Sequence, residues 1–291
     1  MLQHKQWKLI LLMILAMITW GLSWTNAKIL GMYANAPLIM FWRFLFASLS
    51  FIFILKLTKT SFELPYNAIP IITFNSIFMV SYNYFYFKGT QIGLAGAGGV
   101  LVTTLNPILT AGFSRLLLKD NMPKKDWYGL CLGLAGGSII LRFWELNFTT
   151  FYYSGNLFFI LASLSWVSVT IITSKSKNQI SFLQYSFWSF SFSSFLSLPL
   201  LWGGNLFSIF SLDWIFWLNL ITLSVVAMAF GTSIYFYAST ELGPKKASSY
   251  IFLVPLTAIL FAMYFLGEPF QFSTFIGGSL GMLAVYLINI K

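Results

Sequence analysis

Charged residues are scarce in this sequence, and acidic residues are the scarcest. Only 8% of the 291 residues are charged and 58% are hydrophobic, and the mean hydropathy is +0.80. This composition leaves too little polar surface to cover a soluble globule of this size. We therefore expect the whole chain to lie in a lipid bilayer, with no room for a soluble domain.

Cysteine and histidine occur once each, as Cys131 and His4. A single cysteine in an apolar stretch allows no intramolecular disulfide and no metal framework. The seven Asp and Glu residues all lie near the ends of the expected helices, so no nucleophile, base and orienting group can be brought together. The sequence thus argues against an enzyme, a bound metal and a cofactor.

Long apolar stretches, in contrast, recur along almost the whole chain. A spanning helix needs about 20 mainly apolar residues, and charges, Pro and Gly divide the sequence into ten stretches near that length. The sequence therefore predicts an all-α polytopic membrane protein with ten transmembrane helices. The expected spans are 9–27, 37–57, 69–87, 95–118, 127–141, 154–173, 182–201, 214–238, 247–266 and 270–290.

Basic residues are unevenly shared between the two sides of the membrane that ten spans define. One side receives only Lys28, Lys88 and Arg142. The positive-inside rule places the other side in the cytoplasm, which puts both termini there and suits the cell inner (plasma) membrane. It also explains the net charge of +10, so nucleic acid is not an expected partner. The lysine-rich side receives Lys5, Lys8, Lys56, Lys59, Arg115, Lys119, Lys124, Lys125, Lys175, Lys177, Lys245, Lys246 and Lys291.

The two halves of the sequence resemble each other. The segment 41–48 (FWRFLFAS) aligns with 187–194 (FWSFSFSS), and the same register places Trp20 on Trp166. Ordered matches of this kind extend over four helices of each half, which indicates an internal duplication. Because each half has an odd number of spans, the second is expected to insert upside down relative to the first.

These features together resemble a known family, the drug/metabolite transporter superfamily in its ten-helix form with two EamA-type repeats. The motifs are ITWG at 18–21, WRF at 42–44, Asn-Pro at 106–107 and Gly-Glu-Pro at 267–269. Each motif alone is weak, but the combination is specific and covers nearly the whole chain. Asp120 stands where the family usually has Glu, which hardly disturbs the resemblance.

The resemblance implies two repeats, 1–145 and 146–291, that enclose a substrate cavity and give alternating access to it. The first, third, fourth, sixth, eighth and ninth helices would line the cavity, and the fifth and tenth would be peripheral. Bacterial relatives export amino acids and other metabolites, whereas eukaryotic relatives move nucleotide sugars and sugar phosphates. The family therefore fixes a mechanism better than a substrate.

Arg43 is the clearest charge inside an expected span. A charge at that depth can contact a substrate carboxylate or phosphate. It can also snorkel, because six residues of helix bring it within about 9 Å of the membrane surface. Its partner in the repeat is the neutral Ser189, and we favour snorkelling.

Further cavity candidates are polar and aromatic residues at helical spacing. A polar stripe on the fourth helix, ending at Ser114, must face either a cavity or a neighbouring helix. The tryptophans suit apolar or stacking walls, and the alternative for each tyrosine is an anchor at the membrane interface. Together with Arg43, the candidate cavity residues are Trp20, Trp24, Asn75, Tyr82, Tyr86, Thr103, Asn106, Thr110, Trp166, Tyr235 and Tyr250.

Glycine and proline mark possible helix breaks. Gly96, Gly98 and Gly99 open the fourth helix, where a gate is the alternative to close packing of helices. Pro107 is expected to free a backbone carbonyl and kink its helix. Pro255 occupies the equivalent position in the second half. The pairs Gly129/Gly133 and Gly277/Gly281 are interpreted as packing positions.

A secondary carrier of a small molecule is the function that these residues favour. A cavity of Trp, Tyr, Asn and Thr suits hydrophobic, aromatic or other neutral amino acids, whose export we expect. Two alternatives stay open: a small anionic or nucleotide-like metabolite recognised by Arg43, and a lipid carrier that is flipped across the bilayer. No carboxylate lies in the middle of a span, so the usual device for proton coupling is missing. The expected partners are the substrate and membrane lipid, with the protein a monomer or a homodimer.

Overall fold

The computed structural model describes residues 2–93, 95–118, 123–140, 143–145, 147, 155–267 and 272–289. These residues form helices and connecting turns, with no strand among them. The helices are α1 (Leu2–Leu30), α2 (Ala36–Leu57), α3 (Ile69–Ile92), α4 (Ala95–Leu118), α5 (Lys124–Ile140), α7 (Asn156–Ser174), α8 (Phe182–Ser197), α9 (Trp214–Ile221), α10 (Ser233–Glu241), α11 (Pro244–Ser249), α12 (Val254–Leu266) and α13 (Phe272–Asn289).

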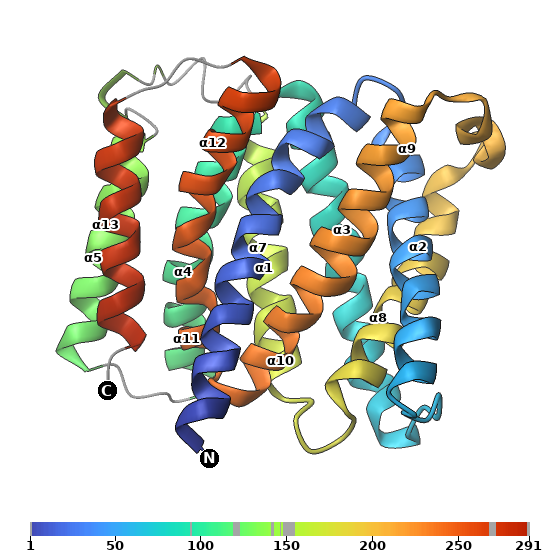
Figure 1. Ribbon diagram of the computed structural model, residues 1–291, viewed down its shortest axis with the longest axis horizontal. Helices are drawn as coiled ribbons and strands as arrows, with labels where there is room; N and C mark the ends of the chain where they lie inside the picture. The colour runs from blue at the N-terminus through green and yellow to red at the C-terminus, as the bar shows by residue number, and fades with distance from the viewer. Residues whose placement is uncertain are drawn as a thin grey trace.

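Two of the expected spans are composite rods. A π-helix, Thr222–Thr232, joins α9 to α10, and a 3-10 turn, Tyr250–Leu253, joins α11 to α12. Counted this way, the described helices make ten rods, which agrees with the ten-helix prediction (Figure 1). By length and composition, six are long and apolar enough to cross a membrane: Trp7–Leu30, Ala36–Leu57, Gly98–Leu118, Asn156–Ser174, Trp214–Glu241 and Pro244–Leu266.

Side-chain caps fix where several helices begin. Asn35 accepts a hydrogen bond from the backbone N–H of Leu38 at the start of α2, Ser181 caps α8 in the same way, and Asp213 caps α9. Each cap satisfies one of the N–H groups that the first turn of a helix leaves without a partner. These caps lie one or two residues before the expected spans at 37–57, 182–201 and 214–238, so the helices begin where the apolar stretches predict.

The two halves pack in a pattern that repeats when they are exchanged. α2 contacts α8, and α5 contacts α13. The contact of α3 with α7 has its counterpart in the contact of the π-helix Thr222–Thr232, which we call the π-segment, with α1. The contact of α4 with α7 has its counterpart in the contact of α12 with α1. In Figure 1, α1 begins at the end of the bundle where the N-terminus lies, whereas α7 begins at the opposite end. This is the arrangement expected of two repeats that run in opposite directions.

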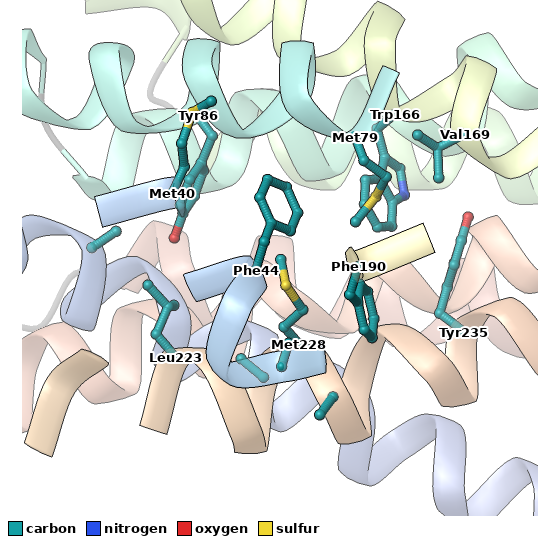
Figure 2. Close-up of a cluster of buried hydrophobic side chains, with 14 of the residues drawn as sticks. Met40, Phe44, Met79, Tyr86, Trp166, Val169, Phe190, Leu223, Met228 and Tyr235 are labelled. Carbon is teal, nitrogen blue, oxygen red and sulfur yellow. The ribbon is translucent and has the colours of Figure 1, made fainter. Parts of the chain in front are cut away.

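The main core lies between the halves. Phe44 on α2, Phe190 on α8, Met228 on the π-segment and Met79 on α3 are all buried, and Figure 2 shows them among side chains from both halves. Apolar packing therefore holds the repeats against each other, and lipid-facing residues cover the outside.

α5 and α13 form a separate pair at one edge of the bundle (Figure 1). Gly129 lies against Ile288, and Gly133 lies against the Phe252 ring. Gly281 approaches the backbone of Phe252. Gly129 lets α5 and α13 approach each other, and Gly133 and Gly281 let this pair approach the bundle at Phe252, as the packing interpretation predicts.

Candidate functional site

A small cavity lies at the centre of the bundle, between the two halves. Its volume is about 20 Å³, which is room for roughly one water molecule. Seven of the ten rods contribute to its wall. They supply Trp20, Ser23, Trp24, Arg43, Tyr82, Asn83, Val102, Thr103, Asn106, Trp166, Met228, Thr232, Ile251 and Val254.

Arg43 points into this cavity and does not snorkel, so the favoured sequence interpretation is wrong. The residue is only 5% exposed, and its Nη1 donates to Asn83 Oδ1 at 2.8 Å. The guanidinium also lies 5.7 Å from the centroids of the Tyr86 and Phe87 rings. Arg43 lies on the face of α2 that meets α3, and the side-chain amide of Asn83 on α3 is available there as a hydrogen-bond acceptor.

Among the residues that the structure describes, no carboxylate pairs with the positive charge of Arg43. In the described ranges the ion pairs are Lys177–Glu241 and Lys245–Asp126, neither of which involves it. Its Nε is buried and has no hydrogen-bond partner among those residues. A buried cation without an anion is costly unless another group pairs with it. The cavity thus presents an open position for a negative group.

Aromatic rings form the facing wall. The Trp20 and Trp166 rings meet edge to face with centroids 5.0 Å apart, and Tyr82 lies 4.7 Å from Trp166. Trp20 Nε1 donates to the carbonyl of Ala227 at 3.1 Å. This bond fixes the ring against the π-segment and leaves its face for packing.

The wall is chemically uneven between the repeats. The first half supplies the strongly polar groups, Arg43, Asn83 and Asn106. The second half supplies Trp166, Met228, Ile251 and Val254, with Thr232 as its one hydroxyl. In the repeat register Val254 is the counterpart of Asn106. A ligand in this cavity therefore meets a polar side and an apolar side, which favours an amphipathic molecule.

Of the twelve residues expected to line the cavity, seven do so: Trp20, Trp24, Arg43, Tyr82, Thr103, Asn106 and Trp166. The other five lie outside its wall. Asn75 Nδ2 donates to Ser189 Oγ at 3.0 Å and so joins α3 to α8. Thr110 is fully buried further along α4, and Tyr250 is buried in the 3-10 turn.

Tyr86 and Tyr235 support the wall from behind. Tyr86 Oη donates to the backbone carbonyl of Ser23 at 2.8 Å, and its ring packs on Trp24 with centroids 4.7 Å apart. Tyr235 Oη and Thr170 Oγ1 share a hydrogen bond of 2.9 Å. Neither tyrosine is an interface anchor, because both are buried.

The expected helix breaks differ from one another. Gly98 packs on the Phe159 ring and Gly99 on Trp24, so these positions serve close approach of helices, while Gly96 lies in the first turn of α4. Pro107 lies inside the continuous α4. Pro255, in contrast, begins α12 directly after the 3-10 turn, where a missing N–H is tolerated.

Asn83 is the most important residue that the sequence interpretation missed. It is fully buried, lines the cavity and holds Arg43. An amide inside an apolar span must find a partner, and that signal would have selected Asn83 together with Asn75. Ser23, Thr232 and Met228 carry no comparable signal, because single small or apolar residues are common in spanning helices.

Known proteins resemble this chain over most of its length. The uncharacterized transporters YvbV and YyaM of Bacillus subtilis are 26% and 24% identical to it, covering 97% and 91% of this chain and 91% and 88% of their own. The uncharacterized transporter sll0355 of Synechocystis is 26% identical over 69% of this chain and 65% of its own length.

A solved crystal structure shares the fold. It superposes with a TM-score of 0.77 at 16% identity and covers 97% of this chain and 96% of the other. The EamA-like transporter family matches the sequence twice, at residues 7–142 and 153–290. The motifs, the two matches and the ten rods agree, and we conclude that this chain belongs to the EamA-like transporter family.

Proposed function

We propose that this protein is an alternating-access carrier for a small amphipathic carboxylate, with aromatic or hydrophobic amino acids as the substrate class and export as the direction. The observation that carries the proposal is a set of three buried polar atoms in one cavity that have no partners among the residues the structure describes. They are the donors Nε of Arg43 and Nε1 of Trp166, and the acceptor Oδ1 of Asn106.

An amino acid offers the complementary groups. Its carboxylate would accept from Arg43, which binds such groups in a charge-assisted manner. Its ammonium would donate to Asn106 Oδ1 and lie near the aromatic rings, which attract cations. An apolar side chain would then extend toward Ile251 and Val254 on the second half. The uneven wall thus supports one orientation of the substrate.

The small volume of the cavity supports a closed state of the carrier. Pockets for small molecules usually measure about 300–1,000 Å³, far more than the 20 Å³ found here. The bundle must widen for a ligand to enter, as alternating access requires.

The proposal can be tested by thermal stability of the purified protein in detergent, because a ligand that prefers the folded state raises the apparent stability. The panel is phenylalanine, phenylalaninamide, which lacks the carboxylate, and hydrocinnamate, which lacks the ammonium. We expect a shift with phenylalanine that is lost with the amide and reduced with hydrocinnamate. The variant Arg43→Gln should lose the phenylalanine shift. An equal shift with phenylalanine and its amide would contradict the role of Arg43.

A second candidate is a carrier of small organic anions without an ammonium group. It is favoured by the lack of any acidic side chain among the cavity residues. In that case hydrocinnamate or a sugar phosphate should stabilise the protein more than phenylalanine does. A response to neither class would favour a lipid-like substrate.

The orientation belongs to the same proposal. Both ends of the described chain lie at the same end of the bundle (Figure 1), as does the start of α5 with Lys124 and Lys125. We place this end in the cytoplasm and the protein in the inner membrane on the positive-inside rule.

A further inference from the structure

A second, larger pocket opens at the lysine-rich end of the bundle. Its volume is about 400 Å³. Four rods meet there, and they contribute Leu118 from α4, Ser174 and Lys175 from the end of α7, Ser239 from α10, and Lys245 and Lys246 from α11. We call it the basic pocket.

α4 connects the central cavity with the basic pocket along one face. Thr103 and Asn106 line the central cavity, and Leu118 lines the basic pocket. Thr110 and Ser114 lie between them at steps of four residues, so all of these side chains share a face of the helix. The same face therefore runs from one opening to the other.

The neighbouring rods carry polar groups over the same interval. Thr170 precedes Ser174 by one turn on α7. Tyr235 lies between Thr232 and Ser239 on the eighth rod, which consists of α9, the π-segment and α10. Thr232 lines the central cavity, whereas Ser174 and Ser239 line the basic pocket. The hydrogen bond between Thr170 and Tyr235, 2.9 Å long, joins the two rods midway.

Several buried hydroxyls have no hydrogen-bond partner among the described residues, and those of Thr110 and Ser114 are the ones that lie on this face of α4. Both residues are 0% exposed, and neither side-chain oxygen has a hydrogen-bond partner in the part of the chain that the structure describes. A buried hydroxyl commonly bonds to the carbonyl one turn back, as Thr170 does with Trp166 at 2.9 Å. Leaving such groups unpaired in a dry interior is unfavourable, so their presence points to a second state in which they are paired.

We infer that the cytoplasmic branch of the transport path runs along this face of α4, from the central cavity to the basic pocket, with Thr110 and Ser114 as its polar wall. In the closed state the Thr170–Tyr235 bond holds α7 against the eighth rod across this path. When the rods separate, water and substrate reach the two hydroxyls. The inference rests on the proposed carrier function but not on the identity of the substrate.

Thiol labelling tests this path directly. In a Cys131→Ser background, Thr110→Cys, Ser114→Cys and two controls are reconstituted into lipid vesicles. A charged methanethiosulfonate reagent that does not cross membranes is added on the lysine-rich side. Leu118→Cys marks the basic pocket. Leu116→Cys lies on the outer face of α4, where the native side chain is 76% exposed and faces lipid.

We expect labelling of Leu118→Cys, Ser114→Cys and Thr110→Cys, with none at Leu116→Cys. Labelling of Leu118→Cys alone would overturn the inference, because the path would then end at the basic pocket. Equal labelling of Leu116→Cys and Ser114→Cys would also overturn it, since access would not depend on the face of the helix.

A second variant tests the closing contact. Tyr235→Phe keeps the ring and removes the hydroxyl that bonds to Thr170, so labelling of Ser114→Cys should become faster. An unchanged rate would refute the role of this bond. Labelling is read without any substrate, so the path can stand even when the amino-acid panel shows no ligand, and the amino-acid proposal can stand when the path fails.

Discussion

Arg43 and Asn83 set the chemistry of the cavity at the scale of single residues. Asn83 Nδ2 donates to the backbone carbonyl of Met79 at 2.9 Å, which turns its Oδ1 toward Arg43. The amide orients the guanidinium without neutralising it. A neutral partner therefore leaves the full positive charge for a ligand.

Asn83→Asp should separate orientation from charge. The new carboxylate would lose the hydrogen bond that the amide donates to the Met79 carbonyl. The ion pair with Arg43 would offset this loss, so thermal stability without ligand should be retained. Stabilisation by phenylalanine should disappear, because the charge is already paired. The measurement is the same thermal-shift panel on wild type and variant.

Asn83→Ala provides the matched control. It removes the acceptor of Arg43 without adding a charge, and the loss of a buried hydrogen bond should lower stability by about 1–3 kcal/mol. Phenylalanine binding that persists in Asn83→Asp would show that Arg43 does not receive the carboxylate.

The sequence could identify Arg43 as a charge inside a span. It could not show whether the side chain extends to the membrane surface or into the bundle. Its distance from the helix end is compatible with both snorkelling and burial. The outcome depends on which face of α2 meets α3, and on whether that contact contains an acceptor. Helical spacing within one span does not contain this information, which comes from the packing of two helices.

At the scale of helices, glycine determines how closely rods approach. A Cβ on Gly133 would overlap the Phe252 ring, whereas a Cβ on Gly112 of α4 would have nothing within 4 Å. Gly112 is also exposed. The two positions thus offer the same substitution in a crowded and an open environment.

Gly133→Ala should destabilise the protein by about 1–3 kcal/mol, because the ring must move or the helices must separate. Gly112→Ala should be neutral or stabilising by up to about 1 kcal/mol, since alanine favours helix more than glycine does. Thermal unfolding in detergent measures both. Equal destabilisation by the two substitutions would argue against close packing as the reason for Gly133.

The apolar pattern predicted the existence of the helices but not their internal irregularities. The span at 214–238 corresponds to an α–π–α rod, and the span at 247–266 begins in α11 and is interrupted by the 3-10 turn Tyr250–Leu253. Gly231 lies against Thr19 and Trp20, so the irregular backbone is shaped by a neighbouring helix. Hydrophobic periodicity describes the residues along one helix and contains no information about contacts between helices.

At the scale of the whole molecule, the charge distribution predicts the orientation in the membrane. Lys59 follows α2 at the end of the bundle that carries the termini, whereas Trp202 lies in the connection between α8 and α9 at the opposite end (Figure 1). Trp202 is 95% exposed. These two positions therefore report on opposite sides of the membrane.

In a Cys131→Ser background, Trp202→Cys should react with an impermeant thiol reagent added to intact cells. Lys59→Cys should react only after the cells are permeabilised. The reverse pattern would place the lysine-rich end outside and contradict the orientation proposed here. Reaction of both positions in intact cells would show leaky cells, which a cytoplasmic marker protein detects as a control.

The overall architecture was the most predictable feature. Ten apolar stretches, an internal repeat and an odd number of spans per half together define how the chain must cross the membrane. The floor and walls of the cavity were less predictable, as Asn75 and Asn83 illustrate. Both are amides on α3, yet one bonds to α8 and the other turns toward Arg43, and only the packing of the halves distinguishes them.

The size of the central cavity has a consequence for measured affinity. With room for about 20 Å³, the closed bundle cannot hold a metabolite, so binding is confined to the fraction of molecules that have opened. If one molecule in about a hundred is open, the apparent Kd is about a hundredfold weaker than the intrinsic one, or roughly 2.8 kcal/mol. Modest affinity would then reflect the opening equilibrium and not a poor fit, and a variant that favours opening would bind more tightly without any change in its contacts with the ligand.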